Sequence, residues 1–116
     1  MSWDVSLHAV VDGSDICIPG ADWNHTHNCN KMIYAVMRDL GITTEASWWK
    51  QIHDRTAGES DKFMADVIAG LEAEPARFMA MNPENGWGSY DSLLQVLKEM
   101  RSYGLKFPSA KWDVWG

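Results

Sequence analysis

The spacing of apolar residues changes part-way along this chain, and the change limits the folds open to it. Residues 3–11 alternate between apolar and polar side chains, which is the pattern of a strand with one buried face. Asp12-Gly13 then predicts a tight turn, and residues 15–18 predict a short partner strand. The chain is therefore expected to begin with a β-hairpin.

After residue 30 the spacing becomes helical. Segments with apolar residues at intervals of three and four, or with short helical patterns, are 33–40, 48–52, 63–71, 75–81 and 90–100. Gly104 is expected to end the last helix, and residues 110–115 alternate again as a final strand. These patterns predict an α+β fold. We expect a small, mainly antiparallel sheet of three or four strands, made from the N-terminal hairpin and the C-terminal strand and packed against three or four helices.

The length of the chain limits the number of domains, and its charge limits the functions that it can have. A chain of 116 residues is long enough for one core but not two, so residues 1–116 are expected to form a single domain. The formal net charge of −6 argues against general nucleic-acid binding, which needs a basic surface. No apolar run approaches the roughly 18–20 residues that span a bilayer, and no signal-peptide pattern is visible. Cys17 and Cys29 are therefore expected to be free thiols in a reducing cytoplasm.

Residues 22–30, with the sequence DWNHTHNCN, form the densest group of polar side chains. If they form a third strand, one face carries Asn24, Thr26 and Asn28, which all donate and accept hydrogen bonds. Such a row could bind a small polar ligand. It could equally bond neighbouring loops, with Asn28 or Asn30 capping the following helix. Both interpretations remain open on the sequence alone.

The opposite face of this expected strand carries His25, His27 and Cys29, which are good ligands for transition metals. Their spacing along a strand, roughly 6–7 Å at about 3.3 Å per residue, is too long for one ion without a bulge. They are weak metal candidates, and no cofactor is predicted. His27 and Cys29 could also act as the base and nucleophile of a small hydrolase. The simpler interpretation is a half-buried face of amphipathic residues.

A second notable stretch is the loop 82–89, which contains Asn85, Trp87 and two glycines. Its composition is typical of a tight turn, and Ser89 is well placed to cap the next helix. Trp87 could anchor the loop in the core or offer an aromatic surface to a ligand. We therefore count Asn85 and Trp87 with the candidate ligand-binding residues.

Several segments together resemble one protein family. They are the opening SWDVSL of residues 2–7, the N-x-T-x-N pattern of 24–28, the run TAGES of 56–60, the N-G-W-G loop of 82–88 and the ending of 108–114. The chain resembles a largely uncharacterised family of small proteins from tailed phages and prophages. The position of His27 is often tyrosine in that family, which speaks against a shared metal site. The resemblance implies a phage-associated setting, in the cytoplasm of an infected bacterial host, and supplies no reaction.

Three functions fit these observations. In the first, a phage accessory protein binds a small polar ligand, for which a nucleotide is one candidate, without turning it over, and so sequesters a signal of host immunity. Its ligand-binding residues would be Asn24, Thr26, Asn28, Asn85 and Trp87. In the second, a virion accessory or interaction protein binds a host or phage protein. In the third, a small hydrolase uses the His/Cys face. A homodimer is compatible with all three.

Overall fold

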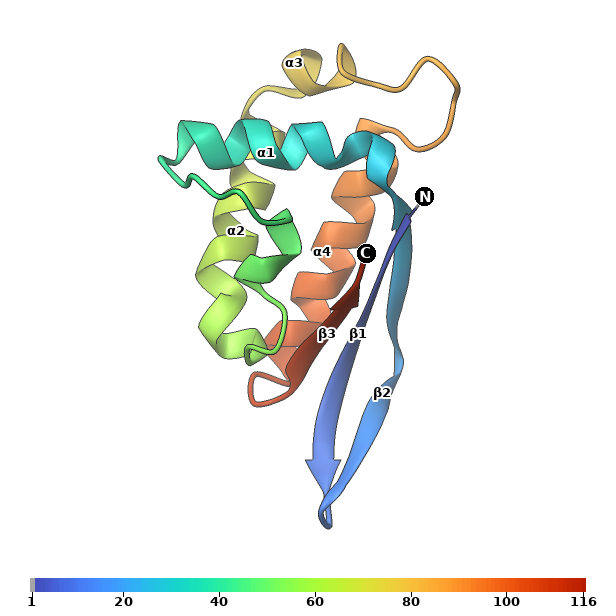
Figure 1. Ribbon diagram of the computed structural model, residues 1–116, viewed down its shortest axis with the longest axis vertical. Coiled ribbons are helices and arrows are strands. Elements are labelled where there is room, and N and C mark those ends of the chain that lie inside the picture. Colours follow the sequence, from blue (N-terminus) through green and yellow to red (C-terminus); the bar gives the residue numbers. More distant parts are fainter. Residues whose placement is uncertain (1) are drawn as a thin grey trace.

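The computed structural model describes residues 2–116 as an α+β fold (Figure 1). Its elements in chain order are β1 (Ser2–Val11), β2 (Ser14–Thr26), the 3-10 turn η1 (His27–Cys29), α1 (Asn30–Asp39), the 3-10 turn η2 (Trp48–Gln51), α2 (Ala57–Ala73), α3 (Pro75–Met79), α4 (Tyr90–Lys106) and β3 (Lys111–Trp115). The described residues thus contain a three-stranded antiparallel sheet and four α-helices, which confirms the predicted fold class. No helix among residues 2–116 has the length and apolar character needed to cross a membrane.

The sheet has the strand order β2-β1-β3, so the first strand of the chain lies in the centre. Both neighbours run antiparallel to β1, and Val5 pairs with Trp23 on one side and with Val114 on the other. The hairpin turn has positive φ angles at Asp12 (51°) and Gly13 (78°), as its sequence predicts. The predicted N-terminal hairpin and C-terminal strand are therefore confirmed.

The second strand departs from the sequence prediction. Residues 15–18 and 22–26 are parts of one strand, β2, instead of two separate strands. The pairing with β1 shifts between Ser6 and His8, so that β2 carries extra residues around Pro19 and Gly20. Proline has no backbone N–H to donate, and Gly20 has a φ of 79°, so a bulge is the geometry that these two residues favour.

The strand ends at Thr26, earlier than expected. The Thr26 side chain accepts a hydrogen bond from the Asn28 N–H at 3.3 Å and starts the turn η1. Asn28 and Asn30 do not cap α1, whose N-cap is Cys29 without a side-chain hydrogen bond. Asn30 instead accepts hydrogen bonds from the indole of Trp3 at 3.0 Å and that of Trp48 at 3.3 Å. The side-chain amide of Asn30, which the sequence predicted as a helix cap, therefore bonds to two tryptophan indoles of the core instead.

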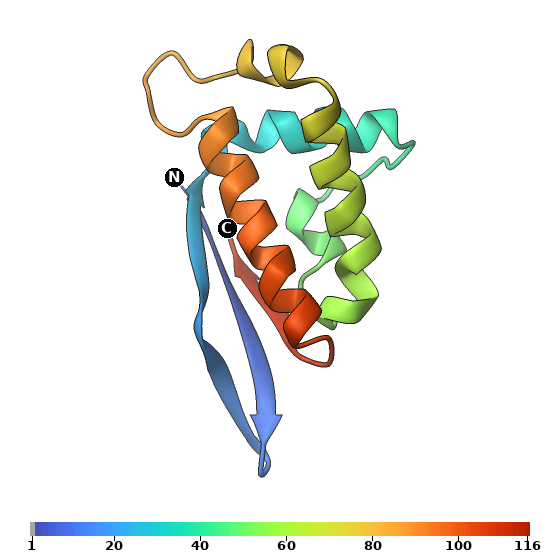
Figure 2. The ribbon, with the colours of Figure 1, turned by 180° about the vertical axis from the view of Figure 1, so that it is seen from behind.

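The helices lie on one face of the sheet and leave the other face open (Figures 1 and 2). Trp3, Trp48 and Trp112 are among the largest fully buried side chains of the core. Gly104 does not end α4 as expected. A Cβ atom there would lie 3.2 Å from Ala57 and 3.4 Å from the ring of Trp112, so the glycine lets α4 approach both. The core therefore fixes the sheet against α2 and α4.

Candidate functional site

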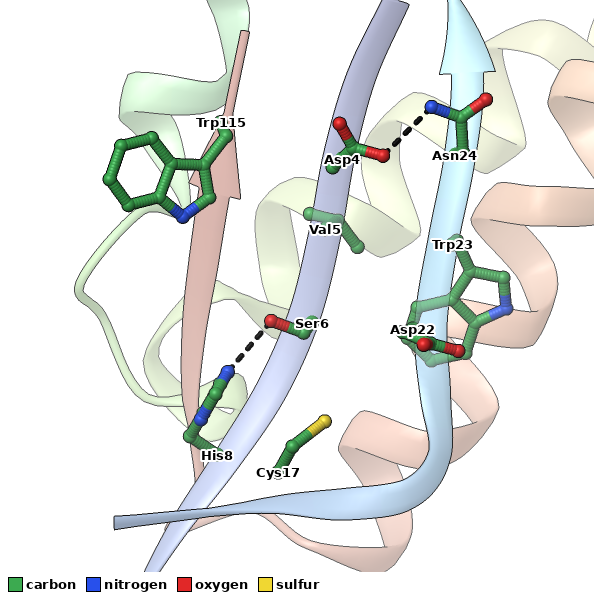
Figure 3. Close-up of a pocket in the computed structure, with 9 residues that line it drawn as sticks. All are labelled: Asp4, Val5, Ser6, His8, Cys17, Asp22, Trp23, Asn24 and Trp115. Carbon is green, nitrogen blue, oxygen red and sulfur yellow. Dashed lines mark hydrogen bonds between the residues drawn. The ribbon is translucent and has the colours of Figure 1, made fainter.

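The open face of the sheet carries a row of polar side chains from β1. Asp4, Ser6 and His8 alternate with the buried residues of that strand and point away from the helices. Together with neighbours on the other two strands they border a hollow of about 510 Å³ (Figure 3). The polar and aromatic residues that matter most to its chemistry are Asp4, Ser6, His8, Asp22, Asn24 and Trp115. We call this hollow the sheet-face site.

Asn24 is the predicted ligand-binding residue that lies in the sheet-face site. Its side-chain nitrogen donates to Asp4 Oδ1 at 2.8 Å and to Ser2 Oγ at 3.0 Å. These bonds join β2 to β1 and fix the orientation of the Asp4 carboxylate (Figure 3). Asn24 therefore acts in the site chiefly by positioning a carboxylate that can accept hydrogen bonds.

Trp115 gives the site an aromatic surface. It pairs with Asp4 across the sheet, and its side chain is 70% exposed. Its indole nitrogen donates to Asp113 Oδ2 at 3.0 Å, which restricts the orientation of the ring. An exposed indole beside a row of hydrogen-bonding groups can stack on a planar ligand. Trp23 also borders the hollow, but it packs edge-on against Tyr103 of α4.

The cysteine of the sheet-face site, Cys17, has a raised pKa. Burial raises the pKa of the Cys17 thiol, and the nearby carboxylates of Asp22 and Asp15 raise it further. A thiol held in its protonated form is a poor nucleophile and a poor metal ligand. Cys17 is therefore a neutral group at the edge of the site.

The sheet-face site and its edge contain three residues in the order of a Ser-His-Asp catalytic triad, namely Ser6, His8 and Asp15. The Ser6 hydroxyl oxygen lies 2.7 Å from His8 Nε2, and His8 Nδ1 lies 3.3 Å from Asp15 Oδ2, although the second contact lacks hydrogen-bond geometry. Acyl transfer at Ser6 would develop negative charge on the substrate oxygen. That charge would form close to Asp4 and Asp22, and carboxylates destabilise an oxyanion that a hydrolase must stabilise. The arrangement suits the orientation of a polar ligand better than its hydrolysis.

The other predicted ligand-binding residues lie around the 82–89 loop. Asn28 donates from its side-chain nitrogen to the Trp87 carbonyl at 3.5 Å, and Asn85 Oδ1 accepts from the Trp87 N–H at 2.9 Å. Trp87 is 71% exposed, so it does not anchor the loop in the core. The methyl group of Thr26 lies beside Gly88 of this loop, where a Cβ atom would collide with it. The turn η1 thus carries Asn28 away from the strand face that it was expected to share with Asn24.

The weak metal candidates do not lie along one strand, because β2 ends at Thr26 and His27 and Cys29 belong to the turn η1. His25 is buried, with Nδ1 3.1 Å from the Thr26 carbonyl oxygen and Nε2 2.9 Å from Ser92 Oγ. His27 stacks on Trp49, with ring centroids 5.6 Å apart. Cys29 is buried, and burial raises the pKa of its thiol. Within residues 2–116 no group of three or more histidine, cysteine or acidic side chains is arranged to hold a metal ion.

Comparisons with protein-family models, with curated proteins and with solved structures found no match to this chain. The resemblance to the phage family therefore stays a prediction.

Sequence reasoning placed Asn24 among the ligand-binding residues but missed Ser6, His8 and Trp115. The alternation of residues 3–11 did indicate that the first two face away from the core. No local pattern in the sequence could predict the pairing of Trp115 with Asp4, because the two residues are 111 positions apart in the sequence.

Proposed function

We propose that this protein binds a small polar ligand in the sheet-face site and does not turn it over. The observation that carries the proposal is the hollow of about 510 Å³ that has the Asn24–Asp4 hydrogen bond on one side and the exposed indole of Trp115 on the other. A volume of this size fits a small ring compound. Stacking on the indole and hydrogen bonds to the carboxylates would act on the same ligand.

The charge of the site narrows the ligand class. Asp4 and Asp22 accept hydrogen bonds and repel anions, so a ring that carries amino groups is favoured over a phosphate group in the hollow. A nucleobase has this chemistry. A nucleotide would therefore bind with its base in the site and its phosphates directed towards solvent.

In an infected bacterium, such binding would serve the phage by lowering the free concentration of the ligand. The resemblance to small phage and prophage proteins supports a role in the cytoplasm of an infected bacterium. A protein that holds a nucleotide signal of host immunity lowers its free concentration in proportion to the amount of protein present. No catalytic step is needed for that effect.

The experiment has two stages. Native mass spectrometry of the protein purified without chelator would detect a retained molecule, and its mass would identify the compound class. Isothermal titration with adenosine and with adenosine monophosphate would then measure affinity. We expect adenosine to bind at least as tightly as its monophosphate, because the carboxylates repel the added charge.

The matched variants are Trp115→Ala and Trp87→Ala, because the two side chains are equally exposed, at 70% and 71%. Loss of base stacking in Trp115→Ala should weaken binding by about 1–3 kcal/mol, which is roughly 5- to 150-fold in Kd. Trp87→Ala should leave the Kd unchanged. A clean mass without bound compound, together with no heat of binding for any common nucleoside, would refute the proposal.

A further inference from the structure

The side-chain N–H donors around the sheet-face site are engaged within the protein. Asn24 donates to Asp4 Oδ1 at 2.8 Å and to Ser2 Oγ at 3.0 Å, which uses both N–H groups of its amide. The Trp115 indole donates to Asp113 Oδ2 at 3.0 Å. A ligand in the hollow therefore meets the amide oxygen of Asn24 and the ring face of Trp115, and neither of these donates a hydrogen bond.

The hydroxyl group of Ser6 is also engaged (Figure 3). Its oxygen lies 2.7 Å from His8 Nε2, while His8 Nδ1 lies 3.3 Å from Asp15 Oδ2. A carboxylate oxygen repels the lone pair of a bare ring nitrogen, so the proton of the neutral imidazole is on Nδ1. Nε2 then accepts from the Ser6 hydroxyl, and the lone pairs of the Ser6 oxygen stay available to a ligand.

Asp22 offers the hollow a carboxylate with both oxygens available. It lines the hollow, and within residues 2–116 no hydrogen bond or ion pair engages its side chain. The Trp23 indole on the same border donates to Glu99 Oε2 at 3.2 Å. The Cys17 thiol is a weak donor, and its sulfur lies 3.7 Å from the Ile18 carbonyl oxygen. The polar groups left for a ligand are thus acceptors, contributed by Asp4, Ser6, Asp22 and Asn24.

A surface that offers only acceptors selects a ligand by its donors. The two oxygens of one carboxylate match two N–H groups that point the same way, as in the fork of a guanidinium group. Among the common nucleobases, only guanine carries two such N–H donors side by side, at N1 and at the 2-amino group. Adenine presents the lone pair of N1 next to its amino group, and a carboxylate repels that lone pair.

We propose that the sheet-face site selects a guanine base, with the Asp22 carboxylate accepting hydrogen bonds from N1–H and from the 2-amino group. This inference rests on the proposed function and narrows it, because it names the nucleobase that the same hollow binds. The charge of the carboxylate strengthens both hydrogen bonds. Both bonds lie in the plane of the base, so its ring face stays available for stacking on the Trp115 indole.

Isothermal titration with guanosine, inosine and adenosine tests this selection. Inosine is the matched ligand, because it keeps N1–H and lacks only the 2-amino group of guanosine. We expect guanosine to bind roughly tenfold more tightly than inosine, since inosine loses one hydrogen bond to a charged group. Adenosine should also bind more weakly than guanosine, because its N1 has no proton to donate.

Asp22→Asn is the variant that tests the carboxylate. It keeps the shape of the side chain but replaces one acceptor oxygen with an N–H donor, which opposes the 2-amino group of guanosine. The preference for guanosine over inosine should therefore disappear. Asp12→Asn is the matched control, because it removes the same charge from an exposed aspartate outside the hollow, and it should keep the preference. Circular dichroism would confirm that both variants fold.

The outcomes separate this inference from the function on which it rests. Inosine or adenosine that binds the wild-type protein as tightly as guanosine would overturn the selection of guanine but would leave the proposed function intact. A preference for guanosine that persists in Asp22→Asn would overturn the assignment of the base to Asp22. If none of the three nucleosides binds, both the inference and the proposed function fail.

Discussion

The imidazole Nε2 of His25 lies 2.9 Å from the hydroxyl oxygen of Ser92, and this contact joins the end of β2 to the first turn of α4. The other ring nitrogen lies 3.1 Å from the Thr26 carbonyl oxygen, which can only accept, so Nδ1 carries the proton. Nε2 then accepts from the Ser92 hydroxyl. Ser92 also accepts from the Ser89 N–H at 2.9 Å, so the histidine completes the cap of α4.

This arrangement predicts that the stability of the fold depends on His25 protonation. Burial lowers the pKa of His25 from its ordinary value of 6.5, and the Thr26 carbonyl offsets only part of that shift. The unfolded chain therefore binds more protons than the folded chain near that pH, and the free energy of unfolding should fall as the pH drops from about 7.5 to 5.5. Urea unfolding across that range would measure the fall.

The control for this prediction is His25→Gln, which removes the titrating group. Its free energy of unfolding should be lower by roughly 1–3 kcal/mol at pH 7.5, because a buried hydrogen bond is disturbed. It should also vary less with pH than that of the wild type. An equal slope in both proteins would show that other groups cause the pH dependence.

Gly88→Ala should destabilise the protein more than Gly86→Ala. Both glycines have positive φ angles, 85° and 74°, so both substitutions strain the backbone by about 1 kcal/mol. A Cβ at Gly88 would also collide with the Thr26 methyl group and lie 3.1 Å from Cys29 Sγ, whereas a Cβ at Gly86 would meet nothing within 4 Å. Thermal or urea unfolding of the two variants would separate steric conflict from backbone strain. Equal losses would contradict the close packing of the loop on β2.

Ser60→Ala tests the contact that holds β3 against α2. The buried indole of Trp112 donates to Ser60 Oγ at 2.9 Å. Without that acceptor the indole N–H has lost its partner in the core, which should lower the free energy of unfolding by about 1–3 kcal/mol. Ser102→Ala, at an exposed position of α4, should change it by less than about 0.5 kcal/mol. A Ser60→Ala protein as stable as the wild type would contradict the role of this bond.

The local patterns of the sequence predicted most of the fold. The helix start predicted at Ser89 is present, because its cap depends on residues only three positions apart. The errors occur where distant residues compete for a local group. Asn30 bonds to Trp3 and Trp48 instead of capping α1, and that preference depends on the folded core.

The candidate site was harder to predict for the same reason. The alternation of side chains along the expected strand placed Asn24 on one strand face, and the structure confirms that Asn24 belongs to a strand, β2. Asn28 was assigned to the same face on the assumption that the strand continued, but the Thr26 side chain starts a 3-10 turn. Trp115 lies in the site because β3 pairs with β1, and that pairing is known only once the whole sheet is formed.

Asn24→Ala should weaken binding in the sheet-face site, whereas Asn28→Ala should not. The amide of Asn24 holds the Asp4 carboxylate at 2.8 Å, and its loss leaves that acceptor free to move. We expect a loss of about 1 kcal/mol, or roughly fivefold in Kd, for adenosine measured by titration. Asn28 contacts the Trp87 carbonyl outside the hollow. An equal effect of both changes would place the ligand near the 82–89 loop instead.

A fluorophosphonate probe should not label Ser6. Labelling would require His8 Nε2 to take the Ser6 proton while the serine oxygen attacks phosphorus and fluoride leaves. The geometry allows the proton transfer, since the two atoms lie 2.7 Å apart, but Asp4 and Asp22 would destabilise the charge that develops on the phosphoryl oxygen. Intact-mass analysis, with a serine protease labelled in parallel, would measure the adduct. An adduct that disappears in both Ser6→Ala and His8→Ala would contradict binding without turnover and would favour a hydrolase centred on Ser6.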